Sequence, residues 1–432
     1  MARSRCGLSG PWARPERAVP TDSLEASRAA EGAARRSYGK LVAFLAARTR
    51  DVAGAEDALS EAFAAALTQW PERGVPDQPE GWLLTVARRR MVDAVRQRRQ
   101  DETTADYFGL LEELAEPESV EASLPDRRLE LLFACAHPGI EQAARAPLML
   151  QTVLGFDAAT IASAFLVAPA TMGQRLVRAK AKIRQAGIGL QIPGRAHLAE
   201  RLEAVLEAIY AAYAEGWSDA EGADPRRRNL AGEAIWLGRL VAALLPEQPE
   251  ALGLLALMLH AQARRAARRD AQGEYVPLAL QDTAQWDGAM IDEAEALLRR
   301  ASQLRAPGRY QLEAAVQSAH CARRWTGGAD WAAIVQLYEA LQALTGSPVA
   351  ALNRAVALAE TQGVDAGLEA LEALAGDVRL ADYQPYWAAR AELLTRSGAR
   401  AQALDAYQHA IGLEREPAVR RFLQRRAAAL SG

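Results

Sequence analysis

The stretch from Asp157 to Arg184, DAATIASAFLVAPATMGQRLVRAKAKIR, decides how the rest of the chain is interpreted. It predicts two short helices joined by a tight corner, with Asp157 capping the first and Pro169 opening the second. Ile161 and Phe165 lie four residues apart, on one face of the first helix. The apolar residues that recur at helical spacing on the second are Met172, Leu176, Ala179 and Ile183. Each helix is therefore expected to bury one stripe.

A second face of the later helix carries hydrogen-bond donors suited to base edges and phosphates in a DNA major groove. These residues are Thr171, Gln174, Arg175, Arg178 and Lys182. From Ala168 to Ala186 there are five basic residues and no acidic one. The pattern predicts a helix-turn-helix facing DNA, with Gln174 and Arg178 as the base readers. The alternative is a helical hairpin whose charges simply face water.

Length, charge and cysteine usage bound the remaining interpretations. The 432 residues suffice for two to four domains, and 51 Lys and Arg balance 54 Asp and Glu, so DNA contacts must come from local basic islands. Cys6, Cys135 and Cys321 are widely separated and suggest neither a disulfide framework nor a metal knuckle. No apolar run is long enough to span a membrane, which predicts a cytoplasmic protein without a membrane partner.

Almost everything after Ser23 has the composition of helix, which predicts an all-α protein. In AEDALSEAFAAALTQWP the apolar residues Leu59, Phe63, Leu67 and Trp70 form one helical face, and Trp70-Pro71 is expected to end the helix. The acidic residues expected on the other face are Glu56, Asp57 and Glu61. Such a face suits a protein partner with basic helices, although simple solvation explains it equally well.

The next helix, GWLLTVARRRMVDAVRQRRQ, combines a buried stripe with a second basic island. The stripe is Leu83, Ala87, Met91 and Ala94. The basic residues are Arg88, Arg89, Arg90, Arg96, Arg98 and Arg99. Clustered guanidinium groups repel one another, and the single acid Asp93 pairs with few of them, so the island predicts phosphate contacts. A surface lattice of salt bridges is the alternative.

Between the two basic islands the charge changes sign. Residues 101–121 hold eight acidic side chains and no basic one, which predicts a linker kept off DNA by repulsion. The following helical unit contains FACAHPGI, where Cys135 and His137 lie close together without a third ligand. Structural packing is favoured there over a metal site, and no cofactor is expected.

Several long phrases resemble extracytoplasmic-function RNA polymerase sigma factors of the sigma-70 superfamily. AEDALSEAFAAALTQWP, PEGWLLTVARRRMVDAVR and GFDAATIASAFLVAPATMGQRLVRAKAKIR are similar, in that order, to regions 2.2, 2.3 to 2.4 and 4.2. FACAHPGI, EAIWLGRLVAALLPEQPEALGLLALML and APGRYQLEAAVQSAH resemble the branch that carries a C-terminal tetratricopeptide-like extension.

The resemblance implies a role for each group of residues. Glu56, Asp57 and Glu61 match the surface for the β′ clamp helices of core RNA polymerase, and the β flap is implied as a further contact. The loop from Glu72 to Gln78 matches the one that captures a flipped −10 base, although it is dominated by Pro, Gly and charge. The arginine helix would hold the −10 strand, and the Thr171 to Lys182 face would enter the −35 major groove of promoter DNA.

The second half of the chain shows one internal repeat. Gly363 and Gly398 are 35 residues apart, and Ala355 and Ala391 are 36 apart, which predicts tetratricopeptide-like units able to bind a protein or peptide. The arginine cluster at 264–269 is expected to be a solvated helix end, and a contact with DNA or polymerase is the alternative. The expected boundaries are a disordered tail at 1–23, region 2 at 24–100, the linker at 101–125, region 4 at 126–190 and the extension at 197–432.

Catalytic motifs are missing from the sequence. There is no GxxxxGK[ST], HExxH or GxSxG, and the five histidines are scattered, so no enzyme is predicted. The favoured function is a sigma factor with a regulatory extension. The alternatives are a helical-repeat adaptor that scaffolds other proteins and a one-component DNA-binding regulator.

Overall fold

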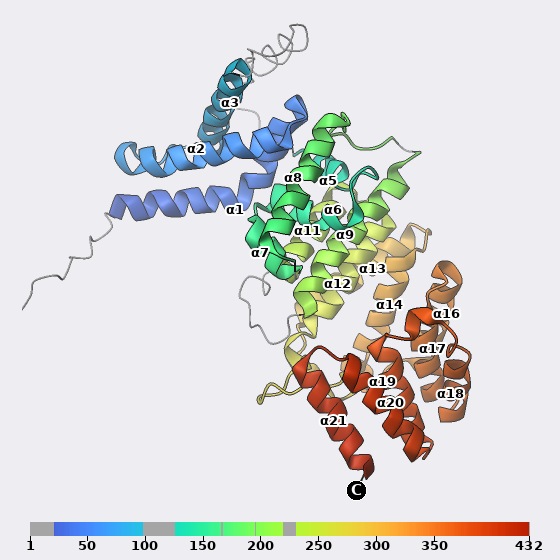
Figure 1. Cartoon of the computed structure of the whole chain (residues 1–432). Coiled ribbons are helices and arrows are strands. Elements are labelled where there is room, and N and C mark those ends of the chain that lie inside the picture. The colour runs from blue at the N-terminus through green and yellow to red at the C-terminus, as the bar shows by residue number, and fades with distance from the viewer. Residues whose placement is uncertain (1–20, 98–125, 166, 195, 219–229, 432) are drawn as a thin grey trace, which may run out of the picture. The chain divides into compact units, whose positions relative to one another are not determined.

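The computed structural model describes residues 21–97, 126–165, 167–194, 196–218 and 230–431 (Figure 1). The all-α prediction is confirmed, since these ranges contain helices and no strand, with one isolated bridge between Arg269 and Tyr275. The expected tail up to residue 20 and the acidic linker at 101–125 lie outside the described residues. The first helix, α1, begins at Thr21, slightly before the expected start at Leu24.

The helices fall into two compact units of the chain. The first comprises Met1–Cys135, Leu148–Phe156 and Val177–Ile192, and the second Ala136–Pro147, Asp157–Leu176 and Pro193–Gly432. The longer helices of the N-terminal part are α1 (Thr21–Thr49), α2 (Val52–Arg73), α3 (Pro79–Gln97), α5 (Arg128–Cys135), α6 (Gln142–Leu154), α7 (Ala158–Ala164) and α8 (Pro169–Gln185). Those that follow are α9 (Leu198–Ser218), α11 (Leu230–Leu244), α12 (Pro249–Ala263), α13 (Gly288–Gln303), α14 (Arg309–Cys321), α15 (Arg323–Thr326), α16 (Trp331–Thr345), α17 (Pro348–Thr361), α18 (Val364–Glu372), α19 (Gln384–Arg396), α20 (Arg400–Leu413) and α21 (Pro417–Ser431).

The core of the first unit forms where α1, α2 and α3 pack on one another. The inward face of α2 is built mainly from alanines, among them Ala55, Ala62 and Ala66, all fully buried. Small side chains let helix axes approach closely. The backbones of α1 and α6 also meet, because a Cβ on Gly39 would lie 2.1 Å from the carbonyl oxygen of Val153. A larger residue at position 39 is therefore excluded unless α6 shifts.

Two details of α2 differ from the sequence-based expectation. The helix continues through Pro71 to Arg73 and ends at Gly74, whose φ of 83° and N–H bond to the Trp70 carbonyl close the last turn. Proline fits there because its φ is helical and it sits in the final turn. Leu67, expected on the buried face, is 50% exposed, because the buried face of α2 consists of the alanine row together with Leu59 and Trp70, and Leu67 lies outside it.

The two helices predicted between Asp157 and Arg184 are present as α7 and α8. Asp157 caps α7 by accepting from the Thr160 backbone N–H at 2.9 Å, and α8 begins at Pro169 as expected. The predicted stripe is buried at Met172, Leu176, Ala179 and Ile183. Ile161 is buried as well, whereas Phe165 is half-buried.

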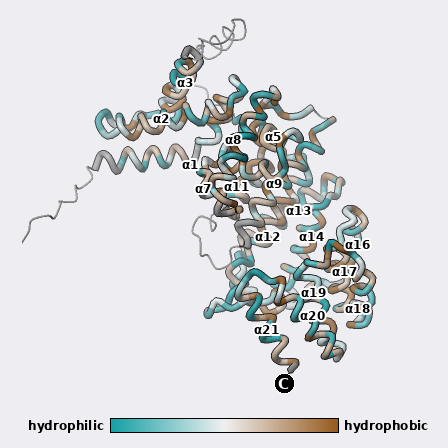
Figure 2. Tube along the Cα trace, in the orientation of Figure 1, coloured by the Kyte–Doolittle hydropathy of each residue, from teal (hydrophilic) through white to brown (hydrophobic). Residues whose placement is uncertain are grey.

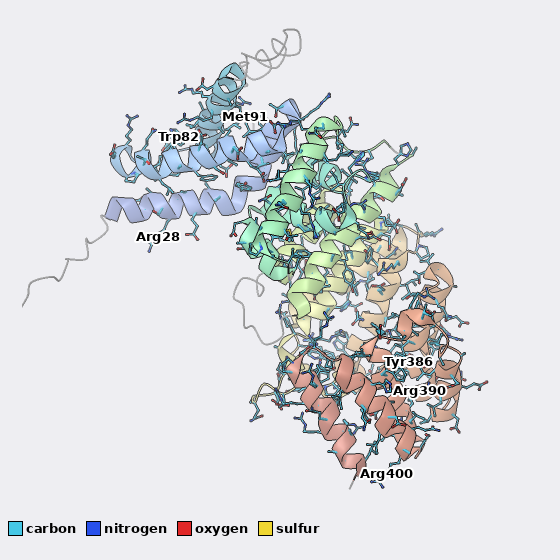
Figure 3. The ribbon with its side chains drawn as sticks, in the orientation of Figure 1. Arg28, Trp82, Met91, Tyr386, Arg390 and Arg400 are labelled. Carbon is cyan, nitrogen blue, oxygen red and sulfur yellow. The ribbon has the colours of Figure 1, made fainter. Side chains whose placement is uncertain are left out.

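The second unit is a succession of helices in which each packs mainly on its neighbours in the chain, as Figure 1 shows for α16 to α20. Gly363 between α17 and α18 and Gly398 between α19 and α20 both have positive φ, so the sequence repeat coincides with two similar corners. Ala355 and Ala391, the paired small residues, are fully buried. Within α19, Arg390 donates to the Tyr386 hydroxyl at 3.1 Å (Figure 3).

The arginine cluster at 264–269 is not the solvated helix end that its composition suggests. Arg264 is only 8% exposed, and Arg269 pairs with Glu416 just before α21. Long guanidinium stems can be buried when their ends find acceptors. Along the described helices apolar and polar residues interleave (Figure 2), and none of these helices is long and apolar enough to cross a membrane.

Candidate functional site

The polar face of α8 is separate from its buried stripe. Each residue advances about 100° around a helix, so the five predicted DNA-facing side chains fall within about 100° of one another, and the buried stripe is centred about 110° away. Thr171, Gln174, Arg178 and Lys182 are exposed. Arg175 is half-buried, and its Nη1 donates to the Ala143 carbonyl at 3.3 Å. The face that was predicted to meet DNA is thus open to solvent, apart from Arg175.

A third sector of α8, about 180–220° from Thr171, carries Lys180 and Arg184. Both side chains turn toward α2 within the first unit. Lys180 Nζ bonds the carboxylate of Glu56, with the two side chains 14% and 8% exposed, and Arg184 Nη1 lies 3.7 Å from Asp51 Oδ2. The basic residues of α8 therefore divide into a row that is exposed apart from Arg175 and a pair that faces α2.

Glu56 is not on a solvated acidic face as predicted, because it is only 6% exposed. Glu56 lies with Ala55 and Leu59 among the buried residues of α2. Burial raises the pKa of Glu56, and the Lys180 charge opposes that rise. Its Oε1 has no hydrogen-bond partner among the described residues. Burial and the negative charge of Glu56 also raise the pKa of Tyr38. The carboxylate belongs to an internal ion pair.

The other two residues of the predicted acidic face of α2, Asp57 and Glu61, are exposed as predicted. They line a cavity of about 290 Å³ in the first unit, together with Asp51, Arg90 and Arg184. Glu61 Oε2 lies 3.2 Å from Arg90 Nε of α3, with both side chains more than half exposed. This pair joins a residue predicted to bind polymerase to one predicted to bind DNA, and exposed pairs of this kind separate at little cost.

The arginines of α3 have different surroundings. The Arg88 guanidinium lies 5.0 Å from the centre of the Phe44 ring and is half-buried, whereas Arg89 and Arg90 are exposed. The structure gives the backbone position of Arg96 in the last turn of α3. Arg98 and Arg99 lie outside the described residues. The stripe of α3 is buried at Leu83, Ala87 and Met91, and Ala94 is half-buried.

The connection between α2 and α3 spans residues 74–78, so Glu72 and Arg73 of the predicted loop belong to the helix. Trp70 and Trp82, one before and one after the connection, pack edge to face with ring centres 5.5 Å apart. Trp82 and Met91 of α3 are labelled in Figure 3. This contact holds the end of α2 against the start of α3, and it thereby positions the connection relative to the arginines of α3.

Cys135 and His137 have structural surroundings. Burial raises the pKa of the Cys135 thiol to about 12, and its sulfur lies 3.4 Å from the Thr152 hydroxyl. His137 Nδ1 accepts the Gly139 backbone N–H at 3.0 Å. Among the described residues no three His, Cys, Asp or Glu side chains are placed to hold a metal ion.

Sequence reasoning missed Lys180. Lys180 was counted among the five basic residues from Ala168 to Ala186. Its angular position on α8 lies outside the row of predicted DNA-facing side chains, and this position distinguishes it from the basic residues of that row. Its partner Glu56 is 124 residues away, so no local pattern connects the two.

Comparison with known proteins places these features in a family. Residues 34–100, which hold most of α1, α2 and α3, match the family described as sigma-70 region 2. Residues 34–100 of this chain therefore form a sigma-70 region 2 domain. The helices that carry Asp57, Glu61 and Arg88 to Arg90 are therefore those of its region 2.

This chain is similar to known proteins well beyond its region 2 domain. It is 40% identical over 365 residues to the uncharacterized protein R00370 of Rhizobium meliloti (strain 1021), covering 83% of this chain and 86% of that protein, and it belongs to the same family. Residues 201–302 match a family of unknown function, DUF6596. No solved structure matches the chain.

Proposed function

We propose that this protein is a sigma factor of the extracytoplasmic-function type, which binds core RNA polymerase and directs promoter-specific initiation in the cytoplasm. The observation that carries the proposal is the combination of a region 2 match with an exposed donor row on α8, outside that match. Region 2 would engage polymerase and −10 DNA, and α8 would enter the −35 major groove as the second helix of a helix-turn-helix. Catalysis would remain with the polymerase.

The exposed groups supply the chemistry that each contact needs. Asp57 and Glu61 present carboxylates to basic clamp helices, while Arg89 and Arg90 present guanidinium groups that suit phosphates. Gln174 and Arg178 have the amide and guanidinium donors that pair with adenine and guanine edges. Glu56 is assigned here to the internal pair with Lys180, so the polymerase surface proposed for α2 consists of Asp57 and Glu61.

Run-off transcription with purified core polymerase tests this proposal. The full chain should co-purify with core and direct initiation from promoters of its own genome. Asp57→Lys combined with Glu61→Lys should abolish co-purification, while Glu25→Lys on an exposed part of α1 serves as a control for reversing a single surface charge. If the protein neither binds core nor supports initiation at any promoter, the sigma-factor proposal is refuted, and the adaptor or the one-component regulator becomes the favoured function.

The extension at 197–432 is proposed to be tetratricopeptide-like and regulatory. Two helix pairs with glycine corners at the same offset support the repeat assignment, and such arrays bind protein or peptide partners on one face. The regulatory part is supported by the family resemblance and by the size of the segment that follows α8.

A further inference from the structure

The second unit contains a cavity of about 470 Å³ that the proposed function does not use. Helices α9, α12, α14, α16 and α17 enclose it, and its polar lining consists mainly of Tyr210, Arg309, Glu313, Gln317, Tyr338 and Asn353. Cavities of roughly 300–1,000 Å³ are the usual size of small-ligand sites. The volume suits a ligand of small-molecule size, or a few residues of a peptide.

The α14 wall of this cavity is held in place from α12. The carboxylate of Glu250 accepts the backbone N–H groups of Tyr310 and Gln311 at 2.9 and 3.1 Å, which caps the first turn of α14. Gly253 lets the two helices approach, since a Cβ there would lie 2.6 Å from the Gln311 nitrogen. The first turn of α14, which supplies Arg309 to the cavity lining, is thus held against α12.

The charges around the cavity do not balance. Arg309 Nε and Glu313 Oε1 lie 2.8 Å apart and offset each other. Behind them Arg264 is 8% exposed, stacks 5.9 Å from the centre of Trp286, and has no carboxylate within ion-pair distance among the described residues. Burial lowers the pKa of Arg264. An unpaired buried guanidinium is unfavourable, so the site attracts one negative charge.

Gln317 connects the buried Arg264 to the surface of the cavity. Its Oε1 accepts a hydrogen bond from Arg264, which leaves the Nε2 amide group as a donor with no partner in the described parts of the chain. A hydrogen bond from a cation polarises the amide and strengthens this donor. The amide of Gln317 is therefore a stronger donor toward an anion in the cavity, although the guanidinium of Arg264 itself stays buried.

Further donors converge on the same space. The hydroxyls of Tyr210 and Tyr338 and the amide of Asn353 line the cavity and have no hydrogen-bond partner within the described ranges. Burial raises the pKa of Tyr338 to about 12 and also raises that of Tyr210, so both hydroxyls keep their protons at neutral pH. Donors that have no partner among the described residues, gathered near one positive charge without a carboxylate, match an acceptor-only group.

We propose that this cavity binds the carboxylate group of a small ligand, with Gln317, Tyr338 and Asn353 as its hydrogen-bond donors. A carboxylate carries the single negative charge that would balance Arg264, and its oxygens accept several hydrogen bonds. Two sources share this chemistry, a free organic acid and the carboxyl end of a peptide. The proposal is independent of the sigma-factor function, because it concerns residues outside region 2 and α8.

Titration calorimetry on the full-length protein tests the site. The probes are succinate, tetra-alanine with a free carboxyl end, the same peptide with a C-terminal amide, and inorganic phosphate. Succinate or the free peptide should bind at one site, and Tyr338→Phe and Asn353→Ala should each weaken binding about tenfold. Tyr275→Phe, which removes a hydroxyl away from this cavity, should leave binding unchanged.

A second variant places the missing anion inside the protein. Gln317→Glu puts a carboxylate beside Arg264, so it should raise the unfolding midpoint by about 2–4 °C and abolish probe binding. Succinate binding alone identifies a free acid, and binding of the free peptide but not its amide identifies a chain end. Three results would overturn the proposal: no carboxylate probe binding at concentrations on the order of 10 mM, phosphate or the amide binding as well as the acids, or Gln317→Glu binding like the unmodified protein.

Discussion

The ion pair between Lys180 and Glu56 allows a quantitative prediction about the first unit. Lys180→Met keeps the length of the side chain and removes its charge, so Glu56 loses the group that bonds its carboxylate. Removing one partner of a buried pair costs about 3–5 kcal/mol. Because both side chains retain slight exposure, at 14% and 8%, we expect about 3 kcal/mol, the lower end of that range.

Hydrogen exchange of α2 amides measures this loss without requiring the whole chain to unfold in one step. A loss of about 3 kcal/mol corresponds to exchange about a hundred times faster. Arg184→Met is the matched control on the same helix, since Arg184 is 53% exposed and lies 3.7 Å from Asp51. We expect at most about 1 kcal/mol from that change.

The double variant Glu56→Gln with Lys180→Met separates the buried charge from the lost contact. It removes both charges, so exchange of α2 should return most of the way to that of the unmodified protein. The reasoning is refuted if Lys180→Met speeds exchange less than about threefold, or if the double variant exchanges as fast as Lys180→Met alone.

The same pair sets a pH dependence with a definite sign. The folded pKa of Glu56 is raised by burial, so the folded state binds this proton more tightly and stability increases as the pH falls through the folded pKa. Lys180 lowers that pKa, hence Lys180→Met should raise it further. The stability difference between the variant and the unmodified protein should shrink as the pH falls, and a difference that grows on acidification would contradict the assignment.

Three further outcomes are expected. Arg178→Ala should weaken promoter use by about 1–3 kcal/mol in a way that depends on the −35 sequence, and a uniform loss across promoters would instead identify a phosphate contact. Leu83→Ala in the core of region 2 should cost about 2–5 kcal/mol by thermal melting, whereas Leu67→Ala, at a side chain 50% exposed, should stay within about 0.5 kcal/mol. Truncation after Gly194 should change promoter activation in a reporter strain, and identical activity in every condition would show that the extension is not regulatory.

Periodicity predicted the helices and most of their buried faces. The stripes of α3 and α8 were found from apolar spacing, and the cap at Asp157 from residue type, because such features depend on neighbours within one or two turns. The face of α2 was only partly found. Its interior is lined by alanines, and hydrophobic spacing alone gives more weight to larger side chains such as Leu67.

The residues of the candidate sites were likewise predicted only in part from the sequence. The exposed rows of α8 and α3 follow from helical geometry and charge, so the sequence located Gln174, Arg178 and Arg89 on solvent-facing surfaces. It also placed Glu56 among polymerase-binding residues, whereas the structure buries it. A carboxylate on an alanine-rich helix looks solvated until a partner from elsewhere in the chain is known.

The sequence by itself determined the all-α class, the presence of a sigma-70 region 2 domain and the division of α8 into buried and polar faces, since helical period, local charge and sequence similarity carry that information. Only the tertiary structure decided which charges are used internally. Lys180 meets Glu56 across 124 residues, and Arg264 meets Gln317 across 53, and neither separation leaves a local pattern. Whether a charge faces solvent or a partner depends on which helices pack together, and that is set by the sum of many apolar contacts rather than by the charged residues themselves.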